Sequence, residues 1–132
     1  MSRSFATLLV LPLMTVAVFA QTPVRVACLG DSITYGDRLA DRDAQSYPAV
    51  LERLSQGRFV VGNFGVNGAT ALPRISFRSW IDTRACRDAL AFAPDVAVVM
   101  LGINDLLGYR DQLEDYPAAL RDVVARFQSL PA

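Results

Sequence analysis

A serine flanked by glycines stands directly after the first apolar run of the chain. Residues 30–36, GDSITYG, follow the apolar residues 24–29. A serine on a tight strand-to-helix turn presents its hydroxyl at the carboxyl end of a sheet, where α/β proteins bind their ligands. The glycines at both ends let the backbone turn sharply and let a substrate approach. The segment predicts Ser32 as a nucleophile, with a polar loop in which Asp31 or Ser32 caps a helix as the equal alternative.

A second polar loop follows the next apolar run. Residues 63–68, NFGVNG, come directly after residues 59–61. The backbone N–H of Gly65 could reach a developing oxyanion without obstruction by a side chain. Asn67 and Gly68 form a strong turn pair, so on its own this segment favours a simple turn.

A third polar loop, residues 102–105 with the sequence GIND, follows the apolar run 96–101. The Asn104 amide could donate a further hydrogen bond to the same oxyanion. Alternatively, Asn104 or Asp105 caps a following helical turn, and on its own this segment favours the cap.

Together the three loops predict one site. In a parallel sheet, loops that follow the carboxyl ends of the strands lie at the same edge. One loop would supply a nucleophile and two would supply hydrogen-bond donors, which makes an acyl-transfer site without its general base. The chain contains no histidine. Of the nearby carboxylates, we expect Asp31 to order its own turn and Asp105 to cap a helix, and Asp37 does not match the motif of a base.

The order of the apolar segments indicates the elements that position these loops. Strands are expected at residues 24–29, 59–61 and 96–101, and helices between Ser46 and Gly57, at residues 81–92 and from about residue 115. This alternation predicts a parallel sheet with helices on both faces. The unbroken apolar run 96–101 suits a strand buried on both faces. As the last strand present, it would also leave an exposed apolar edge.

The expected helices carry apolar stripes at helical spacing. Ser46 is the expected cap of the first helix, with Pro48 in its first turn. Arg84 and Asp88 are spaced as a supporting ion pair in the second helix. The stripes consist of Tyr47, Val50, Leu51 and Leu54 in the first helix and of Tyr116, Ala119, Leu120, Val123, Val124 and Phe127 in the last.

Composition narrows the classes of function. The 13 basic and 13 acidic residues cancel, so no basic face for nucleic acid is expected. Cys28 and Cys86 are expected as two separate buried thiols, although export would permit a disulfide. Without histidine, the two cysteines form no zinc ligand set.

The N-terminus has the pattern of a secretory signal. Arg3 precedes an apolar stretch at residues 5–19, and a small-x-small cleavage site ends at Ala20. A short membrane anchor is the alternative, but the stretch falls short of the ~18–20 residues that a span needs. We expect cleavage after Ala20, a secreted or periplasmic mature domain at residues 21–132, and no stable membrane span after cleavage.

The three loops resemble, in order and spacing, the first three sequence blocks of the SGNH (GDSL-type) hydrolases. The matching positions are Gly30-Asp31-Ser32, Gly65 within Asn-x-Gly-x-x-Gly, and Gly102-x-Asn104-Asp105. The resemblance covers residues 24–132 and is greatest to the secreted carbohydrate esterases that include sialate O-acetylesterase-like proteins. It implies that Ser32 is the nucleophile, and that the N–H groups of Ser32 and Gly65 and the Asn104 amide form the oxyanion hole.

The resemblance also implies a flavodoxin-like α/β/α sandwich of parallel strands in the order 2-1-3-4-5. This chain would hold the first three strands, in the order 2-1-3. The family's fourth block, Asp-x-x-His, has no counterpart here, and Ile103 stands where many relatives have glycine. We expect a C-terminally truncated chain that is close to inert by itself, because a serine hydroxyl without a base is a weak nucleophile.

The implied function is hydrolysis of a short acyl ester, in particular an O-acetyl group on a carbohydrate, without metal or cofactor. The alternative is a non-catalytic secreted binding protein that uses the same cleft for acylated glycans. A phosphate- or nucleotide-binding flavodoxin-like module is disfavoured, because the chain has neither a Gly-x-Gly-x-x-Gly nor a Walker loop. Arg74, Arg78 and Trp80 are expected in a wall of the cleft, where Trp80 either stacks on a sugar or anchors the loop. The sequence identifies neither the acyl donor nor the oligomeric state.

Overall fold

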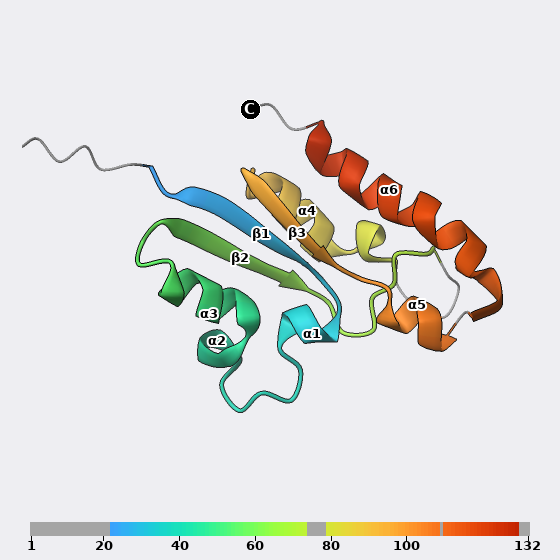
Figure 1. Cartoon of the computed structure of the whole chain (residues 1–132), viewed down its shortest axis with the longest axis horizontal. Helices are drawn as coiled ribbons and strands as arrows, with labels where there is room; N and C mark the ends of the chain where they lie inside the picture. Colours follow the sequence, from blue (N-terminus) through green and yellow to red (C-terminus); the bar gives the residue numbers. More distant parts are fainter. Residues whose placement is uncertain (1–21, 74–78, 109, 130–132) are drawn as a thin grey trace, which may run out of the picture.

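Three parallel strands form the centre of the molecule. The computed structural model describes residues 22–73, 79–108 and 110–129. Strand β1 (Val24–Gly30) lies between β2 (Phe59–Gly65) and β3 (Val96–Met100), and both pairings are parallel (Figure 1). The predicted α/β class, strand order 2-1-3 and parallel pairing are therefore confirmed.

Strand register brings the ends of the strands together. Gly30 is paired with Gly65 of β2 on one side and with Met100 of β3 on the other. The second strand is longer than the predicted residues 59–61: β2 continues to Gly65 because it pairs with β1 along its whole length. All three strands consequently end at one carboxyl edge, from which the polar loops leave.

Helices flank the sheet; the first two predicted helices are shorter than expected, and the last begins where the sequence predicts. They are α1 (Ser32–Tyr35), α2 (Arg42–Gln45), α3 (Tyr47–Leu54), α4 (Arg84–Ala91), α5 (Ile103–Gly108) and α6 (Tyr116–Gln128), with 3-10 turns at Trp80–Asp82 and Arg110–Asp115. The helix expected at residues 81–92 begins only at Arg84, because the Thr83 hydroxyl accepts a hydrogen bond from Cys86 N–H and caps it. Ser46 precedes α3 as expected but forms no side-chain cap bond.

The two faces of β1 are covered by different helices. Ala27 and Leu29 pack with Cys86 and Ala89 of α4 and with Val123 of α6. The opposite face, which carries Cys28, lies under α3, and Figure 1 shows α2 and α3 on that side of the sheet. This arrangement gives the three layers that were predicted for the fold.

Strand β3 is less covered than β1. Val96, Val98 and Met100 lie on the face that Cys28 shares, and they are between 37% and 46% exposed. The prediction that strand three is buried on both faces is wrong, because Ala97 on the other face is exposed as well and Val99 is only partly buried. The predicted exposed apolar edge is confirmed. Two members of the predicted helix stripes are also exposed, Leu54 at 67% and Val124 at 38%.

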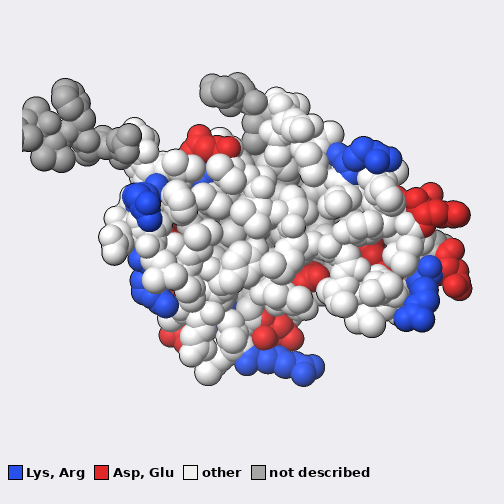
Figure 2. Space-filling model, viewed as in Figure 1, with Lys and Arg blue, Asp and Glu red and all other residues white. Residues whose placement is uncertain are grey.

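The cysteines and charges mostly follow the sequence predictions. Cys28 and Cys86 are separate, buried free thiols, and burial raises the pKa of each. Arg84 and Asp88 form the expected ion pair, at 3.3 Å. On the face shown in Figure 2, charged side chains lie mainly around the rim.

The signal segment predicted at residues 1–20 lies outside the described residues. Within residues 22–73, 79–108 and 110–129, no helix is long and apolar enough to cross a membrane.

Candidate active site

Ser32 is the first residue of α1 and lies directly after the end of β1. It is partly exposed and borders an open pocket of about 330 Å³, together with Ile33, Gly36, Asp37 and Leu39. The nucleophile predicted from the sequence therefore lies in a cavity at the carboxyl edge of the sheet, where a small ester could reach it.

Local hydrogen bonds hold the serine turn. Asp31 is buried, and its Oδ1 accepts a hydrogen bond from Ile33 N–H at 2.9 Å, which confirms that this carboxylate orders its own turn. Gly36 ends the helix with a φ of 87°, and its N–H donates to Ser32 C=O. At Gly30, an added Cβ would lie 2.5 Å from the Met100 carbonyl oxygen, so only glycine lets the strands approach there.

A buried polar pair that the sequence did not predict, Thr34 and Tyr47, lies next to the serine turn. Thr34 Oγ1 lies 3.3 Å from the Tyr47 hydroxyl. The pKa of Tyr47 is raised to about 12, mainly by burial; the Thr34 hydrogen bond lowers it, and Cys28 and Asp31 contribute to the rise. The Tyr47 phenol thus stays neutral at physiological pH and can donate a hydrogen bond.

The N–H of Gly65, which was expected to bind an oxyanion, is already hydrogen-bonded within its own strand. Its N–H donates to Asn63 Oδ1 at 3.0 Å. A Cβ added to Gly65 would clash with the backbone of Tyr35, so this position is glycine because the backbone of α1 packs against the end of β2. We therefore correct the assignment: Gly65 is a packing glycine rather than an oxyanion donor.

Gly68 has the geometry that Gly65 lacks. It has a φ of 75° in a turn that Ala69 N–H closes by donating to Val66 C=O at 3.0 Å. Among the described residues, no acceptor is bonded to Gly68 N–H. Val66 N–H donates to Gly30 C=O, which ties this turn to the serine turn. The Asn67-Gly68 pair was visible in the sequence as a turn, and its free N–H was not.

The third loop supplies two side chains to the same edge. Asn104 Nδ2 donates to Ala69 C=O at 2.9 Å, and its second N–H has no acceptor within the part of the chain that the structure describes. Asp105 is fully buried, and it accepts hydrogen bonds from Ala71 N–H at 3.0 Å and from Leu72 N–H at 2.9 Å. The expectation that Asp105 caps a helix is wrong, because both of its oxygens bind the loop that follows β2.

Of the three residues expected in a wall of the cleft, Trp80 is the one that the structure describes. Trp80 is fully buried and its Nε1–H donates to Phe64 C=O at 2.8 Å, so it anchors the loop and does not stack on a sugar. Arg74 and Arg78 lie outside the described residues. Asp37 is a wall residue instead, and its Oδ1 accepts a hydrogen bond from Asn67 Nδ2 at 3.0 Å.

Known proteins share both the sequence pattern and this fold. An acetylxylan esterase from Xylanibacter ruminicola is 39% identical over 111 residues, which are 78% of this chain and 23% of that protein. A protein assigned to the G-D-S-L lipolytic family from Desulfitobacterium hafniense is 27% identical, with a TM-score of 0.63 over 80% of this chain and 54% of that one. A protein assigned as an arylesterase from Agrobacterium tumefaciens is 26% identical, with a TM-score of 0.62 over 77% of this chain and 53% of that one.

An acetylxylan esterase from Geobacillus stearothermophilus shares the fold at 24% identity, with a TM-score of 0.61 over 84% of this chain and 57% of that one. The chain thus spans about half the length of these solved relatives and a smaller part of the curated one. The model of the GDSL-like lipase/acylhydrolase family matches residues 28–132. This match covers both the serine turn and the Asn104 loop, and the chain belongs to the GDSL-like lipase/acylhydrolase family.

Proposed function

We propose that this chain carries the nucleophile and the oxyanion hole of a serine ester hydrolase. The observation that carries the proposal is the convergence of three loops at one edge: Ser32 beside an open pocket, Gly68 with a free N–H, and Asn104 with one free amide N–H. Family membership supports the same chemistry.

The reaction would proceed through an acyl-enzyme. Ser32 Oγ attacks the carbonyl carbon, and the carbonyl oxygen becomes an oxyanion that accepts hydrogen bonds from Ser32 N–H, Gly68 N–H and Asn104 Nδ2–H. The alcohol then leaves, and water releases the acid from the ester on Ser32. The fixed turns around residues 30–36 and 66–69 keep these donors in place before the substrate arrives, so their alignment costs little during the reaction.

The proton of Ser32 Oγ needs an acceptor, and these 132 residues contain no histidine that could accept it. Asp105 is excluded as that base, because both of its oxygens accept backbone hydrogen bonds in a fully buried position. Without a base the serine hydroxyl stays protonated and is a weak nucleophile.

For the substrate we propose a short acyl ester on a carbohydrate, with acetyl as the acyl group. The 39% identical relative is an acetylxylan esterase, which supports a neutral acetylated sugar. Among the described residues that line the Ser32 pocket, the charged one is Asp37. A carboxylate there would repel the acid group of a sialic acid, so a neutral sugar fits the pocket better.

One alternative is a non-catalytic binding protein that holds acylated glycans in the same pocket, because a partly exposed serine beside an open pocket suits binding as well as catalysis. The apolar N-terminal stretch also supports our proposal that the chain is secreted or periplasmic.

The test of function is Ser32-dependent release of acetate. A longer chain that continues through an Asp-x-x-His segment should hydrolyse p-nitrophenyl acetate and acetylated xylan, and Ser32→Ala should abolish both activities. Binding of acetylated xylan without hydrolysis by that longer chain would favour the binding protein instead.

A further inference from the structure

The segment that follows Gly68 is buried and fixed from both sides. Residues 69–72 are at most 1% exposed. On one side, Trp80 N–H donates to Thr70 C=O at 2.8 Å and Ser79 Oγ donates to Ala71 C=O at 3.1 Å. On the other side, the first turn of α5 provides every bond.

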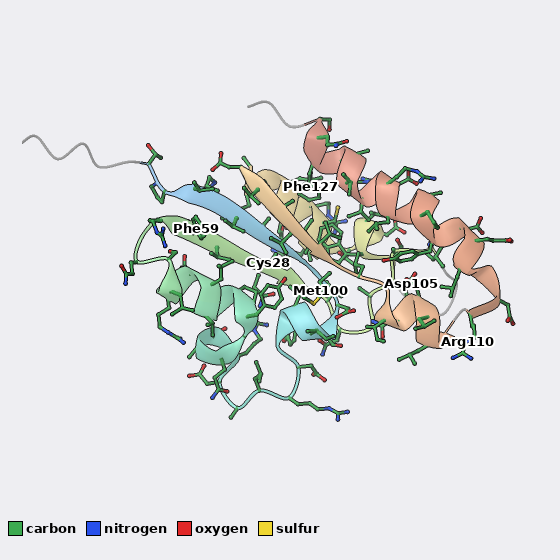
Figure 3. All side chains as sticks on the ribbon, viewed as in Figure 1. Cys28, Phe59, Met100, Asp105, Arg110 and Phe127 are labelled. Atoms are coloured by element: carbon green, nitrogen blue, oxygen red, sulfur yellow. The ribbon has the colours of Figure 1, made fainter. Side chains whose placement is uncertain are left out.

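Asp105 forms the larger part of that second side. Its Oδ2 accepts from Ala71 N–H and its Oδ1 from Leu72 N–H, across 34 and 33 positions of the sequence. Figure 3 shows Asp105 at α5, beside the loop that follows β2. A buried carboxylate is costly unless it is hydrogen-bonded, and bonds between backbone N–H groups and a carboxylate are about twice as strong as neutral ones.

Asn104 adds a third bond to the same segment, from its Nδ2 to Ala69 C=O. This bond determines which way the remaining N–H of the amide points. The two oxyanion donors outside the serine turn, Gly68 N–H and Asn104 Nδ2–H, are therefore both oriented by contacts to residues 69–72, and Asp105 holds those residues in place.

We propose that Asp105 is a positioning residue for the oxyanion hole. It acts through the backbone of residues 69–72, which sets the orientation of the Gly68 turn and of the Asn104 amide. The part of this inference that concerns catalysis rests on the proposed function, whereas the part that concerns geometry does not.

The first experiment measures deuterium uptake by mass spectrometry on the 132-residue chain and on Asp105→Asn. Asparagine has nearly the same size, but its Nδ2 group cannot accept a hydrogen bond, so one of the two N–H groups loses its partner. Exchange in the peptide that covers residues 66–72 should accelerate about 10- to 100-fold. The matched control is Asp95→Asn, because Asp95 also accepts a backbone N–H, from Arg25 at 2.7 Å, at the opposite end of β3.

The inference fails if Asp105→Asn leaves exchange of residues 66–72 unchanged, or if Asp95→Asn accelerates it equally. If Asp105→Asn unfolds the chain, hydrogen exchange in the unsubstituted protein still tests the proposal. Amides of residues 69–72 should then be as protected as those of β1, and exchange as fast as in the exposed residues 37–41 would overturn the proposal.

The second experiment compares kcat and KM of the longer chain, which includes an Asp-x-x-His segment, with those of its Asp105→Asn variant. Loss of one oriented oxyanion donor should lower kcat by about 100-fold while KM changes little, because the donors act on the transition state. A rise in KM at constant kcat would contradict the positioning role. Absence of Ser32-dependent turnover before any Asp105 substitution would reject the proposed function, and the exchange experiment would still judge Asp105.

Discussion

The carboxyl edge of the sheet and the open face of β3 are built in opposite ways. At the carboxyl edge, short loops bind one another through side-chain and backbone hydrogen bonds, as in the Asp105 contacts to Ala71 and Leu72. On β3, Val96, Val98 and Met100 are partly exposed, and their side chains are apolar. The site is therefore held by directional polar contacts, whereas the β3 side depends on apolar burial that the described residues provide only in part.

The largest expected effect is on catalysis, and it would show whether the polar carboxyl edge is sufficient for ester hydrolysis. The 132-residue chain should give almost no Ser32-dependent turnover of p-nitrophenyl acetate, because loss of a triad histidine has cost about 10⁶-fold in a serine protease. Addition of an Asp-x-x-His segment should restore activity, and this activity should fall as the pH drops below about 6.5, since the base acts only when neutral.

Initial rates with and without Ser32→Ala measure this effect. Substantial Ser32-dependent turnover by the 132-residue chain would show that another base operates. Asp37→Asn would then be the first variant to examine, because Asp37 borders the same pocket as Ser32.

The next effect concerns how closely the loops pack at the polar edge. Gly65→Ala should lower the free energy of unfolding by about 3 kcal/mol, because the new methyl group meets the backbone of Tyr35. Gly57→Ala is the matched control: Gly57 has a φ of 83° but no atom near its absent Cβ, so only backbone strain of about 1–2 kcal/mol is expected. Equal losses in denaturant unfolding would refute the packing role of Gly65.

A smaller effect on the free energy of unfolding is expected at two neighbouring positions of α6. Val123 is fully buried between α6 and the sheet, whereas Val124 is 38% exposed. Val123→Ala should cost about 2 kcal/mol of the free energy of unfolding, and Val124→Ala less than about 0.5 kcal/mol. If Val124→Ala costs as much in a thermal or denaturant melt, the face that contains Val124 is covered in solution.

The smallest effect concerns the hydroxyl of Tyr47 below the serine turn. Tyr47→Phe should cost about 1 kcal/mol near neutral pH, because Thr34 loses its partner. The pKa of Tyr47 is raised from 10.0 to about 12, so the unfolded state loses this proton first. The stabilisation is present below pH 10 and declines as the pH rises through about 12.

Denaturant midpoints at pH 8 and pH 11, for the original protein and for Tyr47→Phe, test the direction of this pH dependence. The difference between the two proteins should be smaller at pH 11. A larger difference there would mean that the folded state stabilises the ionised phenol.

Sequence patterns determined the parallel sheet, the strand order and the three loops of the site. Apolar runs of strand length alternate with helical stripes, and polar residues directly follow each run, so local burial and turn preferences were sufficient. The same patterns predicted the turn that carries Ser32 and the Arg84–Asp88 ion pair, because both depend on residues that are close in the chain.

Tertiary structure decided what each loop residue does. Gly65 and Gly68 differ because Asn63 Oδ1 accepts the Gly65 N–H and the backbone of Tyr35 packs against that glycine, whereas Gly68 N–H has no acceptor among the described residues. Asp105 binds N–H groups 33 and 34 positions away, and local preference could only predict a helix cap. Exposure of Val124 and of the β3 face likewise depends on which elements lie opposite, because periodicity identifies an apolar face but does not identify what packs against it.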